Sequence, residues 1–452
     1  MNRTTKHVVA AISFLASANT WAITGNLPIF GQNTLQTLTG TAVLDACVGM
    51  TPIEAQLVGE SIELYARCSE LVNTGNQLDG TGDDTGNLGI TADELATVLQ
   101  DVAPEESEAM GATLTDASND QLSSIKDRLQ FLRTGSSAFP IASLYQTGLN
   151  GGAAGEGDFT RLGIFVNAMY GTGDKETINA ANGVENGFDF DASGFTAGID
   201  YRFSDQFIGG VAVSYTSSDA TFDANNDTND TTGQTVSVYG SYYRENLFFD
   251  GTYSIGSYDY DAIRNINYAN NNPANTSIGS AVARTLTSTT SGDSNSWSIS
   301  GGYNKNVEDK NFTLSVSVNG LDADIDGYSE IGNEFAMTIG NQSVESLQSV
   351  VSAQASLVMS QTYGILVPFV GLAWHHEFED ERRNINAFYT FDPNQELLTF
   401  STEAGDSNFA IFSLGASLVR PGGGQFFLNL DTVLGLEAVN NYVITAGYRW
   451  EI

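Results

Sequence analysis

Positively charged residues are scarce in this chain. Of its 452 residues, 18 are Lys or Arg and 54 are Asp or Glu, which gives a formal net charge of −36 at pH 7. A protein that binds nucleic acid needs a basic surface to neutralise the phosphates. The charge balance therefore excludes nucleic acid from the expected partners.

Long hydrophobic runs are also missing. After the amino terminus, no apolar stretch approaches the roughly 20 residues that a membrane-spanning helix requires, and the mean hydropathy is −0.12. This composition would normally indicate a soluble protein. A membrane β-barrel, however, also lacks long apolar runs and a high mean hydropathy, because only every second residue of its strands faces lipid. A secreted soluble β protein and a membrane barrel both remain open at this point.

Histidine is rare, with 3 residues in the chain. Two of them, His375 and His376, are adjacent on one expected strand. The Gly-Asp-Ser triplets at 292–294 and 405–407 could indicate a serine hydrolase. Such an enzyme, however, needs its catalytic Ser on a rigid turn beside a His. Both triplets fall in expected long loops. We therefore expect no catalytic residue and no enzymatic activity.

One acidic run resembles the first half of a calcium-binding loop. Asp322, Asp324 and Asp326 have the required spacing, but the twelfth position, where a bidentate Glu should stand, is Asn333. Runs of this kind are more often solvated loop. We predict no metal ligand and no cofactor, and weak calcium binding outside the cell stays open.

The amino terminus, residues 1–22, has the features of a secretory signal peptide. Arg3 and Lys6 form a positive region, and the apolar core that follows, at 8–16, is too short to span a membrane. Cleavage is expected after Ala18 or, as we prefer, after Ala22. The protein is therefore expected to leave the cytoplasm.

Residues 23–135 show helical spacing of apolar residues and contain Cys47 and Cys68, the only cysteines of the chain. In an exported protein these two favour a disulfide that staples two helices. Free thiols are the alternative, whereas a metal site lacks nearby His. Residues 136–157 are small and Gly-rich, and we interpret them as a linker.

From 158 to 452 the spacing changes to a period of two, which is typical of strands. In Tyr442–Ile452, apolar or aromatic residues alternate with Thr445, Gly447 and Arg449. The same alternation predicts twelve strands: Arg161–Tyr170, Phe195–Phe203, Phe207–Thr216, Thr235–Tyr243, Leu247–Ser257, Ser296–Tyr303, Phe312–Gly320, Ser346–Met359, Pro368–Phe378, Phe409–Val419, Gln425–Leu436 and Tyr442–Ile452.

The connections between these strands alternate in length. Short ones such as 204–206 and 244–246 separate long polar ones such as 217–233 and 258–295. Short periplasmic turns and long extracellular loops are typical of outer-membrane barrels, whose strand number is even. The fold class is therefore mainly β: a 12-stranded antiparallel transmembrane barrel, preceded by a small α-helical region.

In several motifs, residues 158–452 resemble the barrel of an autotransporter, a protein of type V secretion. The motifs are RLGIFVNAMYGTG at 161–173, FTAGIDYRF at 195–203, PFVGLAWHHEFED at 368–380 and the ending YVITAGYRWEI. The resemblance implies a barrel that delivers its own amino-terminal passenger to the surface and a partly helical linker that ends in the pore. Either 116–133 or 136–157 would fill the lumen.

The last strand fits the outer-membrane assembly signal through Gly447, Trp450 and Ile452, although the family usually ends in Phe. This signal implies the assembly machinery, periplasmic chaperones and outer-membrane lipid as partners. The protein is expected in the outer membrane of a Gram-negative bacterium, with a short non-enzymatic helical passenger at the surface. The alternative is a channel whose helical region plugs the barrel or stays periplasmic.

Strand phase also predicts which charged residues face the lumen. They are Arg161, Arg202, His375, Glu377 and Arg449. We expect Glu377 to pair with one of the three arginines.

Overall fold

The computed structural model describes residues 25–82, 85–135, 161–180, 183–185, 187–223, 225–276, 281–402, 406–421, 424–436 and 439–451. The predicted signal peptide, the predicted linker and Ile452 lie outside these residues. No helix within the described ranges is long and apolar enough to cross a membrane.

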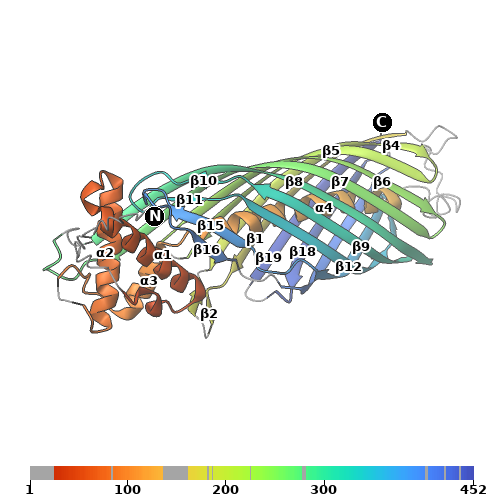
Figure 1. Cartoon of the computed structure of the whole chain (residues 1–452). Helices are drawn as coiled ribbons and strands as arrows, with labels where there is room; N and C mark the ends of the chain where they lie inside the picture. Colours follow the sequence, from red (N-terminus) through yellow and green to blue (C-terminus); the bar gives the residue numbers. More distant parts are fainter. Residues whose placement is uncertain are drawn as a thin grey trace, which may run out of the picture.

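Twelve antiparallel strands form a closed barrel (Figure 1), as predicted. Each strand pairs with the next along the chain, and β1 pairs with β19 to close the ring. The strands are β1 (Leu162–Lys175), β4 (Phe188–Ser204), β5 (Phe207–Phe222), β6 (Thr228–Arg244), β7 (Leu247–Ala269), β8 (Ala281–Val307), β9 (Lys310–Ile325), β12 (Gln342–Leu357), β14 (Gly364–Glu377), β17 (Asn408–Val419), β18 (Gln425–Leu434) and β19 (Val439–Glu451). A short β13 (Met359–Gln361) also pairs with β14.

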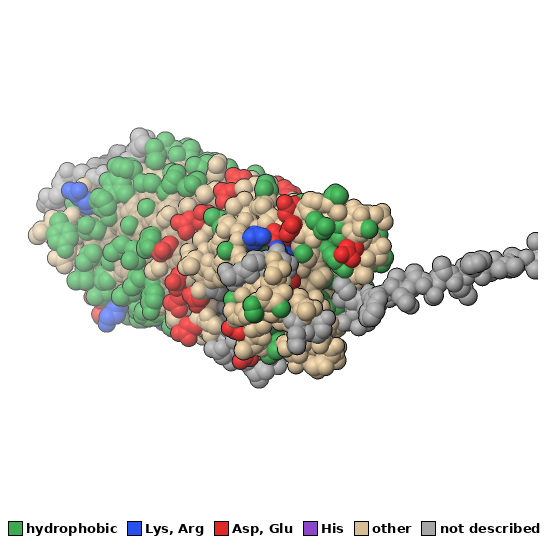
Figure 2. Space-filling view, turned by 90° about the vertical axis from the view of Figure 1, so that its left-hand side faces the viewer, with side chains coloured by type: hydrophobic (Ala, Val, Ile, Leu, Met, Phe, Trp, Pro, Cys, Tyr) green, Lys and Arg blue, Asp and Glu red, His purple; other side chains and the backbone are tan. Residues whose placement is uncertain are grey.

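The alternation of side chains explains this arrangement. On β6, Val236 and Val238 point outward and are half-exposed, whereas Ser237 and Ser241 point inward and are fully buried. A barrel in lipid requires this distribution, apolar outside and polar inside. Figure 2 shows the hydrophobic side chains gathered over one part of the surface, with acidic side chains where that region ends.

Several strands are longer than predicted. The expected loops 217–233 and 258–295 largely continue as strand, and β7 and β8 remain paired as far as Ala269 and Ala281. The outward apolar side chains form a band around the barrel, and beyond this apolar band the outward residues are mostly polar, for example Asp259 and Asp261. Here the outward face is mostly polar, so the lipid-facing apolar alternation that marks a membrane strand is missing, and the prediction of loops was wrong.

The two ends of the barrel differ. At one end, turns such as that between β4 and β5 are short, and we call it the short-turn end. The other, the long-connection end, carries the hairpin β2 (Ile178–Ala180)–β3 (Gly183–Glu185). It also carries a four-stranded sheet of β10 (Tyr328–Ser329), β11 (Met337–Ile339), β15 (Asn384–Tyr389) and β16 (Leu398–Ser401).

Short helices cover the long-connection end (Figure 1). They are η1 (Leu27–Phe30), α1 (Thr34–Met50), η2 (Thr51–Gln56), α2 (Glu60–Leu78) and α3 (Ala92–Asp101). The side chain of Asn33 caps α1, and a reciprocal capping box of Thr91 and Glu94 begins α3. We call residues 25–105, as far as they are described, the cap.

A disulfide joins Cys47 of α1 to Cys68 of α2, 21 positions apart in the sequence. This pairing confirms the prediction from cysteine content. Both cysteines are buried in the core of the cap.

Replacement of Cys47 by Ser should lower the free energy of unfolding of the cap by ~3 kcal/mol, because the unfolded chain regains the freedom of a loop of this size. The barrel should keep its heat resistance, since the bond lies outside it. Limited proteolysis of the cap, beside the gel shift of the unheated barrel, measures both quantities. Alkylation of both thiols in untreated wild-type protein would contradict the expectation.

Candidate functional site: the barrel lumen and its mouth

A single long helix, α4 (Glu106–Gly135), lies inside the barrel (Figure 1). It packs mainly on the wall formed by β5 to β9. Ile125 and Leu129 are buried in one cluster with Phe165 of β1, Ile208 of β5 and Phe248 of β7. The sequence left the occupant of the lumen open, and α4 includes the first of the two candidates, 116–133. The second candidate lies outside the described residues.

Polar contacts follow α4 along the wall. Near its start, Thr113 lies 3.2 Å from Thr231, and farther on the Gln121 amide donates to Ser237 at 2.9 Å. Near its end, Arg128 forms an ion pair with Asp200, close to the short turn between β4 and β5. The helix therefore runs from the long-connection end to the short-turn end.

Arg128 anchors α4 near its carboxyl end. Its side chain is buried, pairs with the buried carboxylate of Asp200, and lies 4.7 Å above the ring of Phe165. Arg449 approaches the other oxygen of Asp200 to 4.0 Å. A buried carboxylate requires such partners, because burial without them is costly.

The helix does not fill the lumen. A cavity of about 1160 Å³ remains between its other face and the opposite wall. Asp116, Asp120 and Asp127 of α4 line this cavity, as do His375 of β14 and Asp431 of β18. Such a polar lining suits water.

The other lumen-facing charges predicted from strand phase lie as follows. His375 is 3.2 Å from the amide oxygen of Gln348, and the Arg202 guanidinium donates to the hydroxyl of Tyr243. Glu377 accepts hydrogen bonds from the Ser346 hydroxyl at 2.6 Å and the Leu347 N–H at 2.8 Å.

The predicted pairing of Glu377 with Arg161, Arg202 or Arg449 is wrong. Glu377 lies at the long-connection end of β14. Arg161, Arg202 and Arg449 lie near the short-turn end, where the Arg161 carbonyl accepts from the Arg202 N–H. Strand phase gives the face of a side chain but not its height along the barrel, and these groups are separated by that height.

Two residues of the expected assembly signal lie within β19. Gly447 faces the lumen, where a Cβ would stand 2.0 Å from the ring of Phe427. Trp450 faces outward, packed edge-on against Tyr448. Only Gly leaves room for the Phe427 ring, which gives Gly447 a structural role in the wall.

A second set of charges fixes α4 at the long-connection end. Arg264 of β7 is buried and donates to both carboxylate oxygens of Glu330, at 2.9 and 2.5 Å. It also lies 3.9 Å from Glu106, the first residue of α4. Burial by itself lowers the pKa of Arg264, but the neighbouring carboxylates of Glu330 and Glu106 together raise that pKa above its usual value. Burial raises the pKa of the nearby Asp101 to about 7.

Sequence reasoning missed Arg128, Asp200 and Arg264 as site residues. A usable signal was present, because Arg128 and Lys126 are the only basic side chains between 106 and 132. A basic side chain on a helix that lies inside an acidic lumen is expected to pair with an acidic residue of the barrel wall. Its partner, in contrast, required the three-dimensional arrangement.

Comparison with known proteins agrees with this geometry. A family model described as the autotransporter beta-domain matches residues 164–431, more than half of the chain. The chain belongs to the autotransporter family. The barrel of this autotransporter is therefore an outer-membrane barrel of type V secretion in a Gram-negative bacterium.

Among solved structures, the translocator domain of the autotransporter NalP from Neisseria meningitidis is similar, with a TM-score of 0.52 and 13% identity over 75% of this chain and 98% of that one. The transport unit of the autotransporter AIDA-I from Escherichia coli gives a TM-score of 0.43 and 13% identity, over 71% of this chain and 97% of that one. No curated protein sequence matches.

Proposed function

We propose that this autotransporter displays its cap, a small non-enzymatic helical passenger, at the cell surface. The path of α4 carries the proposal. It enters the lumen beside the cap and ends near the short turns, which outer-membrane barrels keep in the periplasm. β1 starts at that same end, so the cap and the start of the barrel lie on opposite sides of the membrane.

Export through the barrel would require a largely unfolded passenger. Barrel diameter grows with strand number, and twelve strands leave room for a helix but not for a folded domain of ~100 residues. The Cys47–Cys68 loop, closed over 21 positions, would be the bulkiest cross-link that passes. Under this proposal α4 remains in the pore after the cap has crossed.

The non-enzymatic part of the proposal rests on chemistry. The three His of the chain are His7, His375 and His376, so the cap has none. Cys47 and Cys68, which would be its thiol nucleophiles, are joined to each other. The passenger is thus better suited to binding a surface ligand than to hydrolysis.

We also propose the partners of this barrel. The outward apolar band fits outer-membrane lipid. The last strand, with Gly447 and the outward Trp450, fits recognition by the assembly machinery after delivery by periplasmic chaperones.

A channel is the second candidate function, and the cavity beside α4 favours it. The cavity is lined by more acidic than basic side chains, which suits cations. In this alternative α4 plugs the barrel, and the cap stays in the periplasm.

Labelling of single introduced cysteines on intact cells separates display from a periplasmic cap. Val58 lies on the cap and is highly exposed, and Asp205 lies in the exposed short turn after β4. In Val58→Cys, a membrane-impermeant maleimide should react on intact cells. In the control Asp205→Cys it should react only after the outer membrane is permeabilised.

Protection of Val58→Cys on intact cells, followed by labelling after permeabilisation, would refute display. The alternative, a channel with a periplasmic cap or with α4 as its plug, would then replace display as the proposed function.

A further inference from the structure

The cap does not close its own hydrophobic core. One continuous cluster of buried residues joins the cap to the barrel beyond the apolar band. Leu64, Leu71 and Leu99 of the cap pack in the same cluster as Ile266 of β7 and Leu286 of β8. We call the outer ends of β7 and β8 (258–276 and 281–293), with 326–345 and 384–402, the extension. It includes the sheet β10–β11–β15–β16.

The extension is apolar where a solvated loop would be polar. Ile266, Leu286 and Met337 have no exposed surface, and Phe335 and Phe400 are nearly as buried. These residues share one buried cluster with residues of the cap, so we infer that part of this apolar surface would be exposed without the cap. The extension is therefore built to hold the cap.

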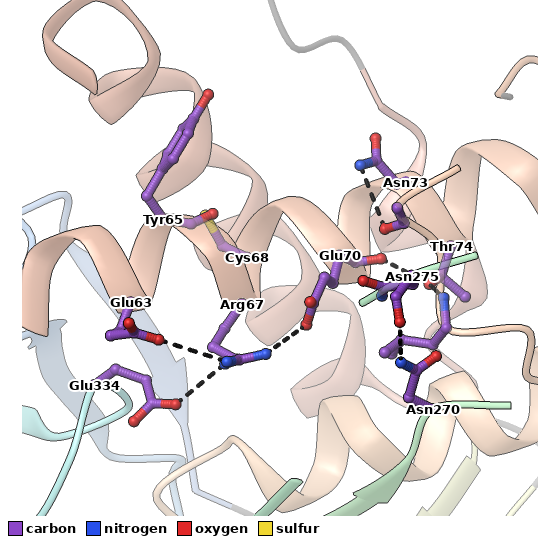
Figure 3. A network of polar contacts seen from close by, with 12 residues as sticks. Glu63, Tyr65, Arg67, Cys68, Glu70, Asn73, Thr74, Asn270, Asn275 and Glu334 are labelled. Carbon is purple, nitrogen blue, oxygen red and sulfur yellow. Dashed lines mark hydrogen bonds and ion pairs between the residues drawn. The ribbon is translucent and has the colours of Figure 1, made fainter. Parts of the chain in front are cut away.

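Buried charges cross the same boundary. Arg67 of α2 is buried and donates to Glu70 of its own helix and to Glu334 of the extension, at 2.9 and 3.2 Å (Figure 3). Glu334 in turn pairs with Arg284 of β8 at 3.0 Å. A buried arginine that loses a partner is costly, so the helix is fixed in one position on the extension.

The backbone of the cap also binds the loop that follows β7. The N–H of Asn271 donates to the carbonyl of Leu88 at 2.7 Å, and the amides of Asn272 and Asn275 donate to the carbonyl of Asn87. Gly89 has a φ of +65°, and a Cβ there would stand 2.9 Å from the backbone N of Asn272. Position 89 therefore requires Gly for two reasons: the backbone has a positive φ, and there is no space for a Cβ.

We propose that the extension is a built-in folding template for the passenger. The proposal rests on display, because a chain that threads the barrel must emerge unfolded beside an extension that is already formed. A cap of about 80 residues has only a small core of its own, so burial against the extension adds to a stability that is small at this size. The apolar surface and the pairing groups of the extension then select the folded arrangement outside the cell.

The test uses the full chain in intact cells. In the double variant Ile266→Asn and Leu286→Asn, polar groups replace two buried side chains of the extension. The matched control, Ile263→Asn and Ile331→Asn, changes two exposed isoleucines of the same region. Proteinase K should cleave the cap of the first variant at least about tenfold faster than wild type, since cleavage follows the open population. The control should stay within about threefold.

A second pair of variants leaves the barrel sequence unchanged. Gly89→Ala should increase the cleavage rate about tenfold. Gly80→Ala is its control, because Gly80 has a similar φ of +76° but no atom within 4 Å of the added Cβ. This pair decides the question if the double variant fails to assemble, which the gel shift of the unheated barrel reports.

Two readouts separate the two proposals. Labelling of Val58→Cys reports whether the cap reaches the surface, and protease resistance reports whether it folds there. A surface cap that resists protease equally in Gly89→Ala and Gly80→Ala, or in the double variant with its barrel intact, overturns the template. If Val58→Cys is not labelled on intact cells, the cap is not displayed, and the folding-template proposal, which depends on display, is refuted as well.

Discussion

Replacement of Arg128 by Ala should release α4 from the lumen more readily than any other single change in that helix. The carboxylate of Asp200 would stay buried without its main partner, a change that costs ~3–5 kcal/mol in protein interiors. The lower end of this range is expected, because Arg449 remains 4.0 Å from Asp200. The stacking of Arg128 on Phe165 is lost as well.

Single-channel recording in planar bilayers measures this release. The wild-type conductance should be small and steady, and Arg128→Ala should add frequent transitions to a larger conductance. In the double variant with Asp200→Asn much of the loss should be recovered, since no unpaired carboxylate then remains. Equal conductance in wild type and Arg128→Ala would show that the ion pair does not hold the helix.

Replacement of Leu414 by Arg should lower barrel stability by ~2–4 kcal/mol, the usual cost of a cation on the lipid face near the middle of the membrane. Leu414 lies in the middle of β17, opposite Leu430 and Val370, and is 53% exposed on the outward face. Lipid covers this position, so the guanidinium would lose its hydration there.

The neighbouring residue is the control. Ser413 faces the cavity and donates to Asp431 at 2.5 Å. An Arg at 413 therefore meets water and a carboxylate, and Ser413→Arg should cost much less. Urea unfolding of both variants in lipid vesicles gives the two free energies. Equal losses would overturn the assignment of faces on β17.

Much of the fold followed from periodicity. All twelve strands were predictable because lipid on one side and water on the other require alternation along every strand. The disulfide was predictable too, since Cys47 and Cys68 have no other partner in the sequence. The strand ends at Ala269 and Ala281 were not, because outside the membrane no lipid requires an outward apolar face.

The candidate site was less accessible to sequence reasoning. Strand phase suggested that Arg202 and Glu377 face inward, but it assigned Glu377 an arginine partner at the other end of the barrel. Pairing depends on the stagger of the strands and on what lies in the lumen. Neither the stagger nor the content of the lumen can be predicted from the sequence of a single strand.

The sequence by itself determined the class of fold, the number of strands, the alternation of short and long connections and the cross-link of the cap. These are local properties, fixed by the solvent on each side of a strand or by residue type. Only the tertiary structure decided that α4 occupies the lumen, that Arg128 pairs with Asp200, and that the cap shares one core with the extension. Those contacts join segments far apart in the chain, and their free energy depends on burial that arises only when the segments meet.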